Sequence, residues 1–172
     1  MKKKIIIGTR KSKLALIYAK IAKKKIQKIK SKFGITSVEI KKITTKGDVV
    51  QNRRISDIGG KGLFTKKIEY ELLSKKIDIA IHALKDIPSV ESKKLLVNCF
   101  LKRNDPRDVL ISRDKKKFQN LPKNSVIGTS SFRREFQLKR IRNDLTYKLI
   151  RGNVDTRIKK LKNKLYDAII LS

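Results

Sequence analysis

The sequence predicts an α/β fold of two domains, each with a mainly parallel sheet flanked by helices. Strand-like and helix-like segments alternate along the chain, and a polar run at 102–108 separates two such series. We therefore expect a first domain at residues 1–103 and a second at 104–172. The apolar strand at 166–172 ends the chain with no helix after it. We expect the second domain to be incomplete and the chain to be truncated.

The first domain is predicted to start with a buried strand at 5–9, followed by a helix that Ser12 caps. Residues 45–62 are rich in glycine and lack apolar periodicity, which indicates a long mobile loop. The apolar run at 95–101 is predicted to be a strand that buries the thiol of Cys99. The predicted buried face of the helix consists of Leu14, Ile17, Ile21 and Ile29. The other predicted elements are a strand at 38–44, a helix at 63–73 and a strand at 77–83.

Two arginine motifs in the second domain predict a binding site for several carboxylates. The chain has 34 Lys and only 12 Arg, which indicates a compositional drift toward lysine. Where an arginine remains despite this drift, we expect the geometry of its guanidinium group to be required. A guanidinium can bind a carboxylate through two parallel hydrogen bonds, which lysine cannot do. Because both motifs follow strand-like runs, we expect their arginines at one sheet edge. The first motif contains Arg133 and Arg134, and the second contains Arg151 and Arg157.

The predicted strands of the second domain are 109–112, 125–129, 146–150 and 167–171, with helices between them.

Composition argues against several other classes of protein. The net charge of +31 would favour nucleic acid as a partner, but the lysines are spread along the chain with few aromatic residues among them. We interpret them as a solvated surface and expect no nucleic-acid partner. The single cysteine excludes an internal disulfide, and His82 has no metal-ligand neighbours in sequence, so we expect no metal. The apolar run at 5–7 is too short for a signal peptide or a membrane span. We expect a cytoplasmic protein without a membrane partner.

The ordered motifs together resemble the porphobilinogen deaminase family, also called hydroxymethylbilane synthase, over essentially the whole chain. They are Gly8-Thr9-Arg10-Lys11-Ser12, Gly47-Asp48, Gly59-Gly60-Lys61-Gly62-Leu63-Phe64, His82-Ala83-Leu84-Lys85-Asp86-Ile87-Pro88, Arg103 to Asp108, and the two arginine motifs. The resemblance implies a monomeric enzyme of tetrapyrrole synthesis that deaminates porphobilinogen and joins four units into hydroxymethylbilane. It also implies two α/β domains around a hinge near Arg103 to Pro106, similar to periplasmic binding proteins.

The resemblance also implies roles for individual residues. Asp86 is expected to be the catalytic carboxylate, which hydrogen-bonds pyrrole N–H groups and stabilises the cationic azafulvene formed when ammonia leaves. The loop at 45–62 matches the family's active-site lid. The residues expected to bind the dipyrromethane cofactor are Lys85, Thr129, Ser130, Ser131, Arg133, Arg134, Gly152 and Arg157. The residues expected to bind substrate are Arg10, Ser12, Lys61, Phe64 and Arg151.

The chain departs from the family pattern in two respects. In the family the dipyrromethane is attached to a cysteine of a third domain, which this chain lacks, and Cys99 does not match that position. Ala83 stands where the family commonly has a serine. One interpretation is a fragment of a working enzyme, and another is a non-catalytic remnant or weak anion-binding module. A basic nucleic-acid-binding protein is a third interpretation, which predicts a steep salt dependence.

Overall fold

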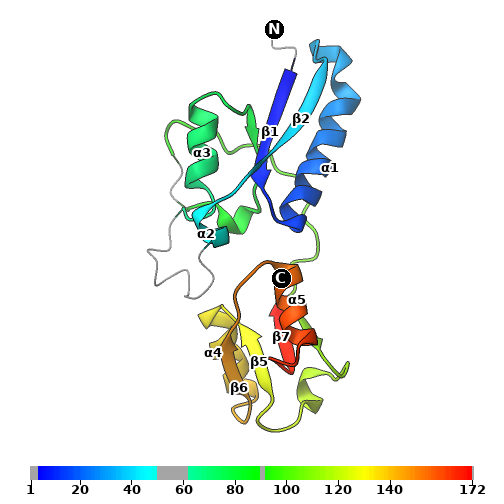
Figure 1. The fold of residues 1–172 in the computed structure, drawn as a ribbon, viewed down its shortest axis with the longest axis vertical. Helices are drawn as coiled ribbons and strands as arrows, with labels where there is room; N and C mark the ends of the chain where they lie inside the picture. The colour runs from blue at the N-terminus through cyan, green and yellow to red at the C-terminus, as the bar shows by residue number, and fades with distance from the viewer. Residues whose placement is uncertain (1–3, 50–61, 90–91, 172) are drawn as a thin grey trace. The chain divides into compact units, whose positions relative to one another are not determined.

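The structure is a computed structural model, and it describes residues 4–49, 62–89 and 92–171 (Figure 1). The chain divides into two compact units, with the division between Cys99 and Phe100. Both units have strands that pair mainly in parallel and helices that pack on them, which confirms the predicted α/β class. The predicted domain boundary between residues 103 and 104 lies near this division and stays a prediction.

The first unit is built on a parallel sheet in the order β2-β1-β3. The central strand β1 (Lys4–Arg10) pairs with β2 (Ser37–Ile43) along its whole length. On its other side it pairs with β3 (Ile79–Ala80), which is shorter than the predicted strand at 77–83. The helices are α1 (Lys13–Ile29), α2 (Lys46–Val49) and α3 (Lys66–Leu73), and the 3-10 turns are η1 (Ser31–Phe33) and η3 (Leu84–Asp86).

Helices α1 and α3 lie on opposite sides of this sheet in Figure 1. Successive side chains of a strand point to opposite faces. Ile7 of β1 is accordingly buried in a cluster with Ala19 of α1, whereas Ile6 packs on a cluster that contains Ile68 of α3. A strand covered on both faces is apolar throughout, which explains the continuous Ile5-Ile6-Ile7 run.

Helix α1 begins where predicted, but it turns a different face to the sheet. The Ser12 hydroxyl accepts a hydrogen bond from the Ala15 N–H at 3.3 Å, so Ser12 is the N-cap. The buried residues are Ala19 and Ala22. The predicted face is wrong, because small alanines let the helix backbone approach the sheet while the larger residues stay outside. The exposed large residues are Leu14, Ile17, Ile21 and Ile29, with 38–52% of their surface accessible.

Two other predictions for the first unit need correction. The predicted loop at 45–62 opens with helix α2, and residues 50–61, including Lys61, lie outside the described residues. The predicted strand at 95–101 is wrong, because this run pairs with none of the described strands. Leu96 is 81% exposed, and the thiol of Cys99 is exposed and not buried. An extended segment without a neighbouring strand gains neither ladder hydrogen bonds nor a buried face.

The second unit has a sheet in the order β4-β7-β5-β6. Strands β5, β6 and β7 run parallel to their neighbours in this group, and β4 is antiparallel to β7. A 3-10 turn, η4 (Phe118–Asn120), stands between β4 and β5 in place of the predicted helix. The strands are β4 (Val109–Ser112), β5 (Val126–Thr129), β6 (Thr146–Leu149) and β7 (Ala168–Leu171), and the helices are α4 (Phe132–Ile141) and α5 (Val154–Lys162).

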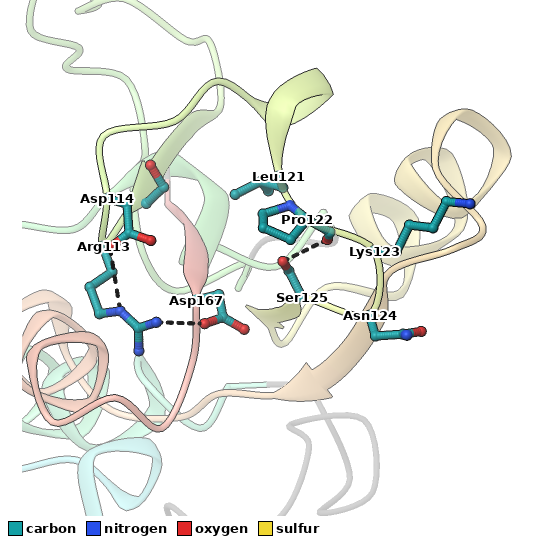
Figure 2. Close-up of a pocket in the computed structure, with 9 residues that line it drawn as sticks. Arg113, Asp114, Leu121, Pro122, Lys123, Asn124, Ser125 and Asp167 are labelled. Atoms are coloured by element: carbon teal, nitrogen blue, oxygen red, sulfur yellow. Dashed lines mark hydrogen bonds and ion pairs between the residues drawn. The ribbon is translucent and has the colours of Figure 1, made fainter.

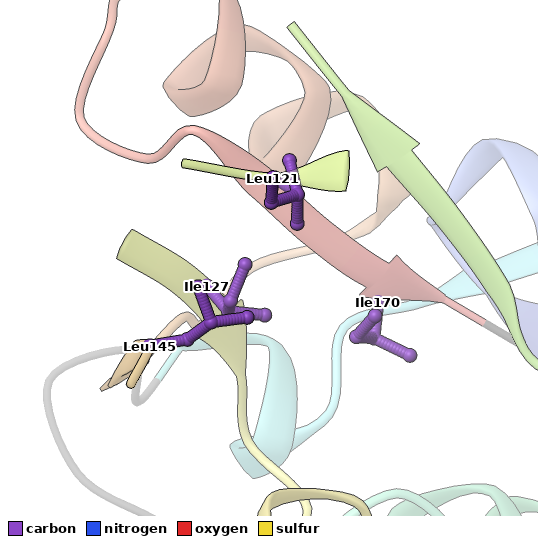
Figure 3. Close-up of a cluster of buried hydrophobic side chains, with 5 residues drawn as sticks. Leu121, Ile127, Leu145 and Ile170 are labelled. Atoms are coloured by element: carbon purple, nitrogen blue, oxygen red, sulfur yellow. The ribbon is translucent and has the colours of Figure 1, made fainter. Parts of the chain in front are cut away.

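The last described strand, β7, is covered by its neighbours in the sheet and by helix α5. Strand β7 lies between β4 and β5. Ala168 and Ile169 are fully buried, and Ile170 is 5% exposed. One face of β7 joins a core that includes Ile127 (Figure 3), and Ile169 packs with Leu161 of α5 on the other face. The antiparallel edge strand β4 and the preceding helix α5 therefore help to bury β7.

These packing assignments predict opposite outcomes for two isoleucine substitutions in the first unit. Ile7→Ala is expected to lower the free energy of unfolding by about 2–5 kcal/mol, because it leaves a cavity in the core. Ile17→Ala is expected to change it by less than about 0.5 kcal/mol, because Ile17 is 52% exposed. Urea unfolding followed by circular dichroism measures both. A cost for Ile17→Ala as large as that for Ile7→Ala would show that the assigned face of α1 is wrong.

Candidate functional site

The carboxyl ends of β5 and β6 bring the two arginine motifs to one edge of the second sheet. The two strands are parallel neighbours, with Thr129 opposite Leu149 at the last pair. Helix α4 begins at Phe132, three residues after the end of β5, and helix α5 begins at Val154, five residues after Leu149. The N-terminus of a helix carries a partial positive charge and free N–H groups, so two such ends at one edge favour an anion. The predicted convergence of the motifs is confirmed.

Three arginines of this edge act on one another electrostatically. Burial lowers the pKa of the Arg157 guanidinium, and the charges of Arg151 and Arg134 lower it further. Arg151 is only 6% exposed. Arg157 donates from Nε to the carbonyl oxygen of Gly152 at 2.8 Å, which directs its side chain. Like charges gathered in a half-buried place create a positive potential that a multiply charged anion would relieve.

Asp108 orients one of these arginines. The Nε and Nη2 groups of Arg134 donate to the two carboxylate oxygens of Asp108 at 2.8 and 2.7 Å. This bidentate pair holds the plane of the guanidinium. The sequence places Asp108 in a polar run before β4, but nothing in the sequence pairs it with a helix 26 residues later. By contrast, Arg133 is exposed on α4, and the structure does not bring it into this arginine cluster.

The small polar residues of the motifs shape the two turns. The Thr129 hydroxyl accepts from the Ser131 N–H at 3.2 Å, and the Ser131 hydroxyl accepts from the Arg134 N–H at 3.4 Å as the N-cap of α4. Ser130 is half-buried between them. Gly152 has φ +112°, which residues with a side chain rarely adopt. These turns therefore depend on the residue types that the motifs contain.

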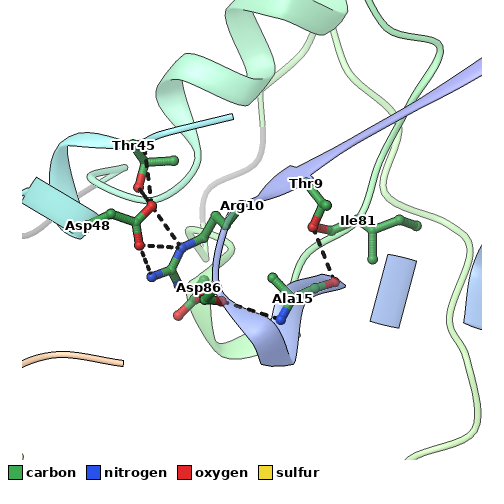
Figure 4. Close-up of polar contacts among 8 residues, drawn as sticks. Thr9, Arg10, Ala15, Thr45, Asp48, Ile81 and Asp86 are labelled. Carbon is green, nitrogen blue, oxygen red and sulfur yellow. Dashed lines mark hydrogen bonds and ion pairs between the residues drawn. The ribbon is translucent and has the colours of Figure 1, made fainter. Parts of the chain in front are cut away.

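In the first unit, an arginine and two aspartates meet at the carboxyl end of β1 (Figure 4). Arg10 donates to Asp48 Oδ1 from Nε at 3.1 Å and from Nη2 at 2.5 Å. Its Nη1 lies 3.5 Å from Asp86 Oδ2, and Asp86 ends the turn η3. The three side chains are 12–19% exposed. These three side chains by themselves have a formal charge of −1.

An aromatic ring holds the other face of Arg10. The Cζ atom of Arg10 lies 4.0 Å from the centre of the Phe64 ring, which is a cation–π contact. Gly47 is required beside the ring, because a Cβ atom there would lie 2.3 Å from Phe64 Cε1. Phe64 therefore meets a guanidinium in this structure, and its predicted contact with a pyrrole ring stays a prediction. The cofactor-binding role of Lys85, exposed on η3, also stays a prediction.

Two residues of this region, Asp48 and His82, have pKa values below their usual values. Burial raises the pKa of Asp48, but hydrogen bonds from Arg10 and Thr45 outweigh it and leave the pKa below its usual value. Burial lowers the pKa of His82, against the opposing charges of Asp86 and Glu69. The Nδ1 atom of His82 is buried without a hydrogen-bond partner among the described residues. His82 is therefore neutral near pH 7.

A pocket of about 240 Å³ lies at the opposite edge of the second sheet, where β5 and β7 begin (Figure 2). Arg113 donates to Asp167 there at 3.0 Å, and Asp167 also accepts from the Val126 N–H at 2.8 Å. Arg113 and Asp167 thus neutralise each other in this pocket. We therefore place the functional site at the arginine edge and not in this pocket.

Within residues 4–49, 62–89 and 92–171, no group of three or more His, Cys, Asp or Glu side chains could hold a metal ion. No helix of these segments is long and apolar enough to cross a membrane.

The fold and these two sites define an α/β protein with charged side chains gathered at the carboxyl ends of parallel strands. The chain belongs to the porphobilinogen deaminase family: residues 5–172 match the family model described as "Porphobilinogen deaminase, dipyromethane cofactor binding domain". The chain is 51% identical over 168 residues to a protein named "Porphobilinogen deaminase" from Rickettsia bellii (strain OSU 85-389). It is 48% identical over 172 residues to the one from Bacillus subtilis (strain 168).

The matches cover nearly all of this chain but only part of the relatives. The Rickettsia match covers 98% of this chain and 55% of the relative, and the Bacillus match covers 100% and 54%. The chain therefore spans about half the length of the curated relatives it matches. The family's domain is described as one that binds a dipyrromethane cofactor, and the residues at the arginine edge fit such a polycarboxylate.

The lowered pKa of Asp48 predicts a pH-dependent contribution to stability. A carboxylate whose pKa is lower in the folded than in the unfolded chain stabilises the fold above its unfolded pKa of about 3.9, and this contribution is lost as the pH falls through the folded value. Asp48→Asn is expected to cost about 1.5–3 kcal/mol at pH 7 and less at pH 3. Urea unfolding between pH 3 and 7 measures the difference. The control is Glu39→Gln, which removes an exposed ion pair with Lys4. A cost of Asp48→Asn that does not change with pH would contradict the assignment.

Proposed function

We propose that this chain forms the cofactor- and substrate-binding part of a porphobilinogen deaminase. The proposed activity is the stepwise deamination and head-to-tail condensation of four porphobilinogen molecules into hydroxymethylbilane, in tetrapyrrole biosynthesis. The observation that carries the proposal is the contrast between the two sites. The arginine edge of the second unit is positive and suits carboxylates, whereas the site of Arg10, Asp48 and Asp86 has a formal charge of −1 and suits a cation.

The arginine edge would hold the dipyrromethane. Each pyrrole ring of this cofactor has an acetate and a propionate group, so the cofactor needs several guanidinium partners. Arg134, Arg151 and Arg157 would bind these groups, with the N-termini of α4 and α5 adding backbone N–H donors. When bound, the dipyrromethane supplies the pyrrole carbon on which the product chain grows. The proposed cofactor contacts of Arg133 and Lys85 require these exposed side chains to turn toward the ligand.

Asp86 would act on the substrate. A carboxylate that is 19% exposed can accept a hydrogen bond from a pyrrole N–H and stabilise the positive charge that develops as ammonia leaves. Arg10 would hold the Asp86 carboxylate in place through the contact at 3.5 Å. His82, held neutral by burial, would add no competing positive charge beside Asp86. Ser12, Lys61, Phe64 and Arg151 complete the proposed substrate contacts.

The remaining parts of the proposal concern attachment and environment. We infer that the cysteine that binds the dipyrromethane lies in the part of the family's length that this chain does not match. Cys99 is an exposed residue of the first unit, three positions after the exposed Leu96. An exposed free thiol is in keeping with a reducing compartment, which supports a cytoplasmic protein. A monomer that binds neither nucleic acid nor membranes completes the proposal.

Asp86→Asn is expected to lower the rate of porphobilinogen consumption about 10²–10³-fold, because the amide keeps the shape but loses the charge that stabilises the transition state. The rate is measured in a whole enzyme that contains this chain, and intact mass confirms that the dipyrromethane is still attached. The matched control is Glu71→Gln, which removes a carboxylate of the same unit that pairs with Lys41 on the outside of the sheet. Near-normal turnover of Asp86→Asn with the cofactor attached would refute the catalytic role.

Arg151→Lys is expected to weaken binding of a synthetic dipyrromethane with acetate and propionate groups roughly 10- to 100-fold, because lysine retains the charge but loses the planar fork. Isothermal titration calorimetry on this chain measures the dissociation constant. Arg140→Lys is the matched control, since Arg140 is exposed in the last turn of α4. Equal affinity of the two variants would reject the bidentate contact.

A further inference from the structure

In each unit an aspartate contacts the Nε and Nη2 edge of one arginine. Asp108 binds the Nε and Nη2 edge of Arg134, and Asp48 binds the Nε and Nη2 edge of Arg10. In both cases Nη1 is the nitrogen turned away from the aspartate. At Arg10 this nitrogen faces Asp86, the residue with the proposed catalytic role. The sequence motifs contain Asp48 but give it no role.

The contacts of Arg10 with the two carboxylates are unequal. Asp48 is bound through two nitrogens at 3.1 and 2.5 Å, whereas Asp86 is reached by one nitrogen at 3.5 Å, the outer limit of a hydrogen bond. Nε and Nη2 both donate to Oδ1 of Asp48, and Oδ2 lies 3.4 Å from Nε, so Asp48 occupies this edge of the guanidinium. Asp86 therefore receives the field of the positive charge without giving both oxygens to Arg10.

Asp48 is itself firmly held. Its Oδ2 accepts from the Thr45 hydroxyl at 2.7 Å and from the Thr45 N–H at 3.2 Å. Thr45 is 1% exposed, and Asp48 lies in helix α2 beside Gly47, on which the Phe64 ring packs. The Phe64 ring in turn covers one face of Arg10. The guanidinium of Arg10 is thus fixed at one edge and on one face.

We propose that Asp48 is a positioning residue that acts on Asp86 through Arg10. By occupying the Nε and Nη2 edge of the guanidinium, Asp48 prevents Arg10 from closing on Asp86 as a bidentate ion pair. The Asp86 carboxylate is thereby left able to accept hydrogen bonds from a ligand with pyrrole N–H groups. The functional meaning of this arrangement rests on the proposed role of Asp86, whereas the arrangement itself can be tested without substrate.

The test is NMR spectroscopy of this chain labelled with ¹³C at the aspartate carboxyl carbons and with ¹⁵N at arginine Nε, at pH 7. Asp48→Asn keeps an oxygen that can accept from Thr45, but it removes the anionic pair with Arg10. The Arg10 Nε–H resonance is expected to move, and the Asp86 ¹³Cγ resonance is expected to move with it as Arg10 turns to Asp86. Thr45→Val, which removes the hydroxyl donor to Asp48 without changing charge, is expected to give a smaller shift in the same direction.

Glu71→Gln is the matched control, because it breaks another ion pair of the same unit and should leave the Asp86 resonance in place. A moved Arg10 resonance with an unmoved Asp86 resonance would overturn the proposal, and so would an equal shift of Asp86 in Glu71→Gln. If Asp48→Asn does not fold, Thr45→Val decides by the same criteria. The catalytic role of Asp86 is tested by the turnover of Asp86→Asn, whereas these spectra test only the arrangement of Asp48, Arg10 and Asp86. Each proposal can therefore be refuted without the other.

Discussion

The parallel pairing of neighbouring strands is the constraint on which both sites depend. In a parallel sheet all carboxyl ends lie at one edge, so residues that follow different strands meet there. The pairing of β5 with β6 brings together arginine motifs that lie a whole βα unit apart in sequence. The pairing of β1 with β2 and β3 does the same for Arg10, Asp48 and Asp86. Burial of the apolar strands on both faces in turn fixes this pairing.

Each of the two sites contains an ion pair between an aspartate and an arginine, but the two sites differ in charge. In each unit an aspartate accepts hydrogen bonds from the Nε and Nη2 edge of an arginine, Asp108 through both oxygens and Asp48 mainly through Oδ1. In the second unit the surplus of guanidinium groups creates a place for anions, whereas in the first unit a second carboxylate, Asp86, gives the site a negative charge. An enzyme that holds a polycarboxylate and stabilises a developing cation needs both kinds of place. Orientation by fixed partners is what makes such charges effective without reorganisation.

The strands and the arginine edge could be predicted from sequence because buried parallel strands are continuous apolar runs, and residues after them must share an edge. The apolar face of α1 could not be predicted, because its buried residues are Ala19 and Ala22, with Ile26 packed beside them. The apolar run at 95–101 is the same kind of pattern without a neighbouring strand. The aspartates Asp48 and Asp108 could be seen as residues but not as partners, because their arginines lie 38 and 26 residues away.

The central claim is that the arginine edge of the second unit binds the carboxylates of a dipyrromethane. A crystal structure of this chain grown with a synthetic dipyrromethane bearing acetate and propionate groups tests it most directly. The account predicts ligand carboxylates within hydrogen-bonding distance of Arg151 and Arg157 and of the N-termini of α4 and α5. A ligand bound elsewhere, for example in the pocket where β5 and β7 begin, would contradict it.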